Sequence, residues 1–258
     1  MTPQEIFFYR FLIAYTGIWV ISPKRLFTGN WKDELWLVAG GIFGGSLYFF
    51  TENTALGITQ ASNVSFIICT APLLTTILSL LFYKSEKASK GLIYGSLLAL
   101  MGVGLIVFNG SFVLKISPIG DLLTLLAALS WAFYSLIIKK MAGRYPTVFI
   151  TRKIFFYGVL TILPAFLLHP LQPDTAVLLQ PGVLFNLLFL AVLASLICYV
   201  LWNVVLKQLG TVRASNYIYL NPLVTMIASS LILDEKITLV ALGGAACIVC
   251  GVYWAEKK

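Results

Sequence analysis

The sequence predicts an all-α protein, a polytopic bundle of about nine transmembrane helices arranged as two inverted repeats. Of its 258 residues, 59% are hydrophobic and only 11% are charged, whereas soluble domains carry about 25% charged residues. Apolar stretches of about 17–25 residues, the length that spans a bilayer, follow one another with short polar connections. In addition, one long motif occurs twice, which indicates a duplicated unit.

Nine apolar stretches have the length of a span. The connections between them contain Pro, Gly, Asn or charged residues. We expect that the first stretch is not a cleavable signal peptide, because it contains Glu5 and Arg10 and lacks both a basic start and a small-residue cleavage site. The predicted spans are 4–21, 35–57, 61–82, 91–108, 119–139, 148–168, 183–206, 214–233 and 238–254.

Lysine and arginine gather in alternate connections, and this asymmetry predicts the orientation. Lys115 and Lys236 fall on one side. The other side holds Lys24, Arg25, Lys32, Lys84, Lys87, Lys90, Lys139, Lys140, Arg144, Arg152, Lys153, Lys207, Arg213, Lys257 and Lys258. We therefore expect a multi-pass membrane protein with a cytoplasmic C-terminus and Met1 outside. The bacterial inner membrane is the expected location. The asymmetry also explains the net charge of +8, so we expect no nucleic acid as a partner.

The duplicated motif begins at Ala61–Asn63 and again at Ala214–Asn216. Each copy continues through a proline, Pro72 or Pro222, with a threonine three residues later, and then through a Glu-Lys pair and two glycines. The copies begin at the third and eighth spans, so an odd number of crossings separates them. They must therefore run through the membrane in opposite directions, as inverted repeats do.

A shorter match between Ile6–Tyr9 and Ile154–Tyr157 extends the duplication. At that offset, the partner of the span at 119–139 would precede Met1. We therefore expect a first repeat over 1–112 that lacks its first helix and a second repeat over 113–258. The first repeat then has four helices and the second has five (4+5), derived from an ancestral protein with two repeats of five helices (5+5). A protein with nine true spans is the alternative.

Taken together, these features resemble the EamA-type transporters of the drug/metabolite transporter superfamily, over essentially the whole chain. The features that carry the resemblance are Gly120–Leu123, Ser130–Tyr134, Ala61–Asn63 with Pro72, Arg213–Ser215 with Pro222, the Glu-Lys connections, and the glycines of the last span in each half. The resemblance implies ten-helix carriers with two repeats and both termini in the cytoplasm. It also implies that they move amino acids, their derivatives or other small metabolites, often outward.

Two charged side chains are predicted inside the bilayer, where a charge needs a partner or water. Arg10 and Glu52 lie at similar depths on consecutive antiparallel spans, near 10 and 8 Å at about 1.5 Å per residue. We expect both to face a central cavity and to form an ion pair. Arg10 would hold a substrate carboxylate, and Glu52 an amine or a transported proton. A purely structural pair, or an arginine that extends to the interface, is the alternative.

Amides and prolines form the next group of candidates. Asn53, Asn63 and Asn216 are predicted substrate contacts; alternatively, Asn63 and Asn216, each with the serine before it, cap their helices. Pro72 and Pro222 each remove a helical hydrogen bond. Their matching positions in the two copies predict hinges, although a simple kink is the alternative.

Aromatic side chains inside the spans could surround an organic solute, although helix packing or lipid contact also explains them. Trp131 and Tyr134 share a helix face, and they are expected to bind substrate together with Trp202 and Tyr217. The remaining aromatic and amide candidates are Tyr199 and Asn203.

Other chemistries have little support in the sequence. Cys247 and Cys250 have the spacing of a metal or redox pair but lie within one span, and His169 is the only histidine. We therefore expect no metal, no cofactor and no enzymatic activity. We expect a secondary transporter that acts as an exporter. Its expected partners are a small-molecule substrate and the lipid bilayer, and the prediction allows for a homodimer. A nucleotide-sugar or sugar-phosphate carrier, or a membrane protein that does not transport, is the alternative.

Overall fold

Helix covers most of the described part of every predicted span in the computed structural model, which describes residues 1–23, 27–83, 89–108, 117–168, 170–171, 175–232 and 237–257. These described residues form helices and no strands, so the predicted all-α class is confirmed. The helices are α1 (Pro3–Ile21), α2 (Trp31–Gly41), η1 (Ile42–Ser46), α3 (Leu47–Ile58), α4 (Ala61–Ile68), α5 (Ala71–Phe82), α6 (Lys90–Phe108), α7 (Pro118–Ala142), α8 (Thr147–Ile162), α9 (Ala165–Leu168), α10 (Thr175–Leu178), α11 (Pro181–Leu188), η2 (Phe189–Ile197), α12 (Cys198–Leu209), α13 (Thr211–Asn216), η3 (Tyr217–Leu220), α14 (Asn221–Ile232) and α15 (Leu239–Glu256).

The apolar length of these helices makes the chain a multi-pass membrane protein. Three predicted spans are helical but contain polar side chains, Arg10, Glu52 and Asn216 among them, which lower their mean hydropathy. Within the described ranges, six helical segments are long and apolar enough to cross a bilayer: Ala61–Phe82, Lys90–Phe108, Pro118–Ala142, Thr147–Leu167, Pro181–Leu209 and Leu239–Glu256. His169 and both Glu-Lys pairs, at 86–87 and 235–236, lie outside the described residues.

The chain divides into two compact units, and each unit combines segments from both halves of the sequence. Unit 1 consists of Met1–Phe50 and Phe133–Gln208, and unit 2 of Thr51–Ala132 and Leu209–Lys258. The unit boundaries fall inside α3 and α7 and before the last residue of α12. The predicted repeats at 1–112 and 113–258 divide the sequence differently from these units, and their exact limits stay a prediction.

In unit 1, the equivalent helices of the two halves, α1 and α8, lie against each other. Their aromatic contacts run in opposite order along the chain. Phe8 meets Phe166, just beyond α8, at 5.6 Å between ring centroids, and Phe11 meets Phe155 at 5.0 Å. Further along α1, the carbonyl of Ser22 accepts a hydrogen bond from Arg152. The two helices are therefore antiparallel, as an inverted repeat requires.

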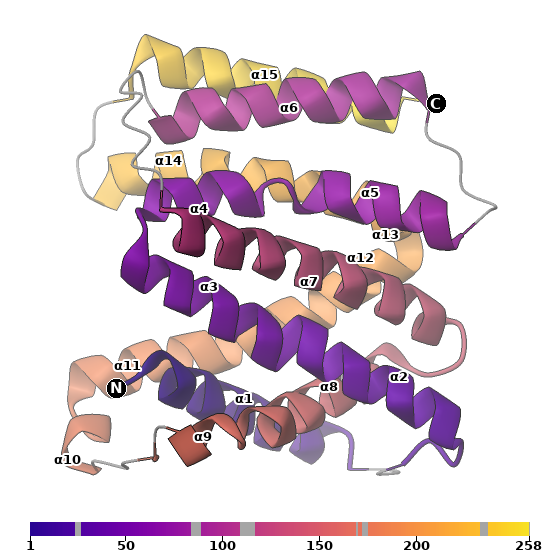
Figure 1. The fold of residues 1–258 in the computed structure, drawn as a ribbon, viewed down its shortest axis with the longest axis vertical. Helices are drawn as coiled ribbons and strands as arrows, with labels where there is room; N and C mark the ends of the chain where they lie inside the picture. The colour runs from indigo at the N-terminus through magenta and orange to yellow at the C-terminus, as the bar shows by residue number, and fades with distance from the viewer. Residues whose placement is uncertain are drawn as a thin grey trace. The chain divides into compact units, whose positions relative to one another are not determined.

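In unit 2, α6 and α15 have the most extensive contact among the described helix pairs, and Figure 1 shows them side by side. Glycines make this approach possible, as they do between many membrane helices. Gly95 lies against the backbone of Gly251, and Gly102 lies against that of Gly244. The residue numbers rise along α6 while those of the contacting glycines fall along α15, so these equivalent helices also run antiparallel. The inverted duplication predicted from the span count is therefore present in the fold.

Two helices contain a stretch of π geometry, which the sequence analysis did not foresee. η1 lies between α2 and α3, and η2 occupies the corresponding place between α11 and α12. π turns loosen the regular hydrogen bonding of a helix. The carbonyl of Gly44 in η1 accepts a 2.6 Å hydrogen bond from the hydroxyl of Tyr199.

Candidate functional site

The third and eighth spans are both interrupted, and at matching places. α4 ends at Ile68, and α5 resumes at Ala71 with Pro72 in its first turn. In the second copy, the 3₁₀ segment η3 separates α13 from α14, and Pro222 again stands in the first turn of the new helix. Proline lacks the backbone N–H that would continue the hydrogen bonds of the preceding turn. This explains why the breaks come directly before the two prolines.

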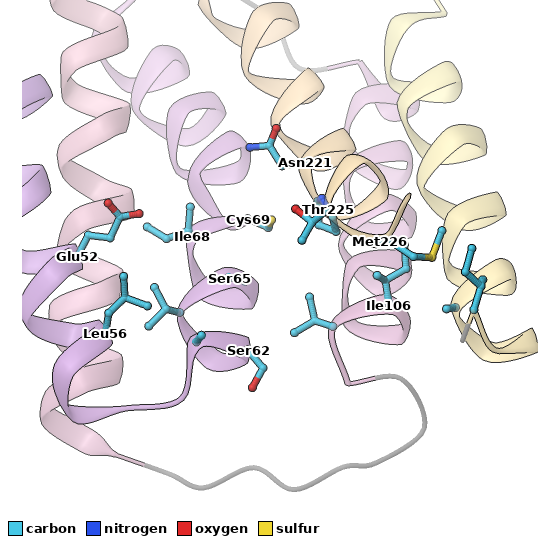
Figure 2. A pocket seen from close by; sticks show the side chains of 16 residues that line it. Glu52, Leu56, Ser62, Ser65, Ile68, Cys69, Ile106, Asn221, Thr225 and Met226 are labelled. Carbon is cyan, nitrogen blue, oxygen red and sulfur yellow. The ribbon is translucent and has the colours of Figure 1, made fainter. Parts of the chain in front are cut away.

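A pocket of about 440 Å³ lies at these breaks, within unit 2. Figure 2 shows Glu52 and Leu56 of α3 at one side of the pocket and Ile106, Thr225 and Met226 at the other. Its size fits a small organic molecule. The lining residues are Glu52, Leu56, Ala61, Ser62, Val64, Ser65, Ile68, Cys69, Ile106, Val107, Asn221, Pro222, Thr225, Met226, Ile237 and Ala241.

The chemistry of the pocket is an apolar wall with a few polar groups. Glu52 is the one charged side chain among the described lining residues. Hydroxyls from Ser62, Ser65 and Thr225 and the amide of Asn221 add hydrogen-bonding groups. A carboxylate beside apolar walls suits a molecule with a cationic group and a nonpolar body, because the carboxylate accepts strong charge-assisted hydrogen bonds.

Several predicted contacts belong to unit 2. Glu52 and Pro222 line the pocket, whereas Asn53, Asn63 and Asn216 are not among its described lining residues. Asn63 and Asn216 are buried. Tyr217, by contrast, is exposed, at 41% of its accessible surface.

The capping alternative for the repeated Ser-Asn pairs is wrong. α4 begins at Ala61 after Gln60, which makes no side-chain capping bond, so Asn63 lies inside the first turn. α13 begins at Thr211, because Gly210 adopts a positive φ of 81° that lets the chain turn into the helix. Asn216 is therefore the last residue of α13 rather than its cap.

Arg10 belongs to unit 1. Its Nε donates a 2.9 Å hydrogen bond to the hydroxyl of Ser195 in η2, and its guanidinium lies 4.4 Å from the ring centre of Phe49. The arginine is 9% exposed. Because Glu52 belongs to unit 2, the ion pair expected between the two side chains would join the units, and it stays a prediction.

Tyr134 takes part in a buried hydrogen-bond chain of unit 1. Its hydroxyl donates to Oδ1 of Asn203 at 2.7 Å, and Nδ2 of Asn203 donates to the hydroxyl of Thr151 at 2.9 Å. The ring also packs on Gly44, where a Cβ would lie 2.3 Å from it. Trp202 is half-buried in α12, and Trp131 is half-buried in α7 on the unit 2 side of the boundary.

Acidic residues at the start of α2 form ion pairs with basic side chains that were predicted to lie in the connections between spans. Lys153 lies inside α8, is 3% exposed, and contacts the carboxylate of Glu34, which also accepts a hydrogen bond from Tyr157. Burial acts to raise the pKa of Glu34, but the hydrogen bonds from Lys153, Tyr157 and Thr28 outweigh it and lower that pKa. Such pairing allows a lysine to be buried inside a helix.

Asp33, the preceding residue, makes a second set of contacts in the same region. Arg144 lies 2.5 Å from its carboxylate, and the hydroxyl of Tyr145 donates to it at 2.9 Å. Burial and this carboxylate raise the pKa of Tyr145. Arg152, 1% exposed, is likewise within α8 rather than in a connection.

Sequence reasoning missed several lining residues, although the repeat contained a signal for them. Ser62 and Thr225 both belong to the duplicated motif, and each has a counterpart in the other copy, Ser215 and Thr75. Most of the predicted contacts are charged, aromatic or amide side chains, and none is a hydroxyl of serine or threonine.

Comparisons with known proteins agree with the membrane fold. A model described as the EamA-like transporter family matches residues 1–108 and 118–255. An Archaeoglobus fulgidus protein named an uncharacterized transporter is 29% identical, over 100% of this chain and 89% of its own length. A Salmonella typhimurium protein named a probable amino-acid metabolite efflux pump is 27% identical, over 91% of this chain and 81% of its own. A solved crystal structure with 18% identity covers 99% of this chain and 88% of its own at a TM-score of 0.81, which shows a shared fold.

Proposed function

Because the chain belongs to the EamA-like transporter family, we propose that it is a secondary transporter that exports small organic metabolites. The molecules carry a protonated amine, as amino acids and many of their derivatives do. They cross by alternating access between the two inverted repeats, with the C-terminus in the cytoplasm of a bacterial cell. The name of the efflux-pump relative supports the direction and the substrate class.

The pocket at the two helix breaks is the observation that carries this proposal. Interrupted helices in matching positions of inverted repeats are where transporters of this architecture bind their substrates. The pocket here has a volume of about 440 Å³, and its one charged group among the described lining residues is a carboxylate. The lining thus favours an amine over a phosphate, which would need cationic partners.

Several further residues receive roles in the proposal. Glu52 holds the ammonium group, and Arg10 holds a carboxylate when the substrate has one. The remaining proposed contacts with the substrate are Asn53, Asn63, Asn216, Trp131, Tyr134, Trp202 and Tyr217. Pro72 and Pro222 act as hinges, since each follows a break in its span.

Counterflow in proteoliposomes tests the proposal. The purified protein is reconstituted, the vesicles are loaded with unlabelled amino acid or amine, and uptake of the labelled compound is followed. We expect saturable counterflow with at least one amine. Glu52→Gln should reduce its rate at limiting concentration about tenfold or more, because a hydrogen bond to a charged group contributes about 1.5–3 kcal/mol. Glu5→Gln, in the capping pair at the start of α1, is the matched control and should keep the rate.

Other results would refute the proposal. Counterflow of sugar phosphates or nucleotide sugars, with none for amines, would favour the alternative carrier class. Identical rates for the Glu52→Gln variant and the parent protein would exclude Glu52 as the ammonium partner. Equal fluxes in vesicles with and without the protein, across amines and phosphates alike, would favour a membrane protein that does not transport.

A further inference from the structure

The duplicated spans of unit 2 make two helix interfaces that are equivalent by the repeat. α4 corresponds to α13, because they contain Ala61–Asn63 and Ala214–Asn216. Likewise α5 corresponds to α14, because they contain Pro72 and Pro222 in the first turn. The interface between α4 and α14 is therefore the counterpart of the interface between α13 and α5.

These two equivalent interfaces are in different states. The pocket separates α4 from α14, and it is lined by Ser62 and Ser65 on one helix and by Asn221 and Thr225 on the other (Figure 2). At the other interface, α13 packs directly on α5. One interface of the pair is thus open and its counterpart is closed.

The two helices of the closed interface bury polar side chains that lack hydrogen-bond partners among the described residues. We call Thr75 on α5 with Thr211, Ser215 and Asn216 on α13 the polar seam. All four side chains are fully buried. Among the described residues, none of the three hydroxyls and neither amide atom of Asn216 has a hydrogen-bond partner. Such groups destabilise the conformation that buries them, and each needs an explanation.

The repeat supplies that explanation for two of the four side chains, Ser215 and Thr75. Ser215 is the counterpart of Ser62, and Thr75 is the counterpart of Thr225. Ser62 and Thr225 line the open pocket, where water or a solute can reach their hydroxyls. Ser215 and Thr75 have the same chemistry at the equivalent positions of α13 and α5, but they are buried, so water and solute do not reach them.

We infer that the polar seam is the lining of a second pocket, which opens between α5 and α13 when the first pocket closes between α4 and α14. This inference rests on the proposed function. The second pocket takes the same solute through neutral hydroxyl and amide hydrogen bonds, because none of its four side chains is charged. In the predicted orientation the first pocket opens outside and the polar seam opens to the cytoplasm.

Sided chemical labelling tests the inference. The four native cysteines are replaced, and single cysteines are introduced at Ser62, Thr225, Thr75 and Ser215. A membrane-impermeant maleimide is then added to whole cells and to inverted vesicles. We expect Ser62→Cys and Thr225→Cys to label from one face, and Thr75→Cys and Ser215→Cys to label, more slowly, from the opposite face. Ile248→Cys, fully buried in the core between α6 and α15, is the control and should label from neither.

The outcomes separate this inference from the proposed function. Labelling of Thr75→Cys and Ser215→Cys from neither face, or from the face that labels Ser62→Cys, would overturn the second pocket. Thr211→Cys provides an independent reading where one of the variants fails to fold, as judged by size-exclusion chromatography. If the two pairs of cysteine variants label from opposite faces of the membrane but amines show no counterflow, the second pocket is supported and the substrate class is refuted. If amines show counterflow but the cysteines in the polar seam label from neither face, transport is supported and the second pocket is refuted.

Discussion

Gly244 and Gly243 are neighbours on α15 with opposite surroundings. A Cβ on Gly244 would lie 2.7 Å from the carbonyl oxygen of Gly102 and 2.9 Å from side-chain carbons of α6. A Cβ on Gly243 would have nothing within 4 Å. Gly244 is therefore one of the glycines that allow α6 and α15 to approach closely, whereas Gly243 faces open space.

This difference predicts a matched pair of substitutions. Gly244→Ala should lower the melting temperature, because backbone atoms of α6 cannot move aside as a flexible side chain could. Gly243→Ala should be neutral or stabilising, since alanine is favoured over glycine in a helix by about 1 kcal/mol. Melting curves of the detergent-solubilised variants measure both effects. Equal destabilisation by the two alanines would contradict the close approach of the helices.

Tyr134→Phe tests the buried hydrogen-bond chain of unit 1. The substitution removes the hydroxyl that donates to Asn203, and a buried acceptor without its donor costs about 1–3 kcal/mol. We expect the melting temperature to fall by about 2–4 °C for each kcal/mol lost. Tyr253→Phe, on an exposed tyrosine of α15, is the control. A rise in KM for counterflow would show, in addition, that Tyr134 contacts the solute.

Much of the fold follows from the sequence because bilayer thickness and repetition are strong constraints. A membrane helix must satisfy its backbone within the segment, so long apolar stretches predict spans, and six described segments are long and apolar enough. The odd number of spans between Ala61–Asn63 and Ala214–Asn216 then requires an inverted pair. The antiparallel packing of Gly95 on Gly251 is the structural consequence.

The candidate site was less predictable, because it depends on which helices separate. Nothing local distinguishes Ser62 from Ser215 or Thr225 from Thr75, yet one member of each pair lines the pocket and the other is buried. Burial of Lys153 was missed for a related reason. Its partner, Glu34, is more than 100 residues away, and only tertiary contact shows that the charges meet.

The Glu34–Lys153 contact predicts a pH dependence. Hydrogen bonds from Lys153, Tyr157 and Thr28 lower the pKa of Glu34 against the opposing effect of burial. A carboxyl group whose pKa is lower in the folded state adds stability at neutral pH, and this stability is lost as the pH falls through the folded pKa. Lys153→Met removes one of those donors, so the folded pKa should rise. The loss of stability in acid, which begins near the unfolded pKa, should then become smaller or disappear.

Melting temperatures measured from pH 3 to pH 8, a range set around the ordinary glutamate pKa of about 4.3, would reveal this shift. The control is Lys140→Met. That lysine is exposed and lies over the ring of Trp36, with 3.7 Å between its Nζ and the ring centre. Its loss removes the same charge without touching Glu34, so the profile should keep its shape. Superimposable profiles for the Lys153→Met variant and the parent protein would mean that the contact does not stabilise the carboxylate.

Removing hydroxyls from the polar seam should stabilise the protein and slow transport. Thr75 and Ser215 are buried without hydrogen-bond partners among the described residues, and leaving such a group unsatisfied costs about 1–3 kcal/mol. The double variant Thr75→Val with Ser215→Ala relieves this cost only while the interface is closed. We expect a higher melting temperature and, because the closed conformation is then favoured, a lower maximal rate of counterflow.

The equivalent double variant on the open interface is the control. Thr225→Val with Ser62→Ala removes hydroxyls that line the pocket and are therefore accessible to water. No buried polar group is relieved there, so the melting temperature should not rise. A lower melting temperature for the variant of the polar seam would mean that its hydroxyls are satisfied in the closed conformation. The energetic argument for a second pocket would then fail, whatever the rate of counterflow.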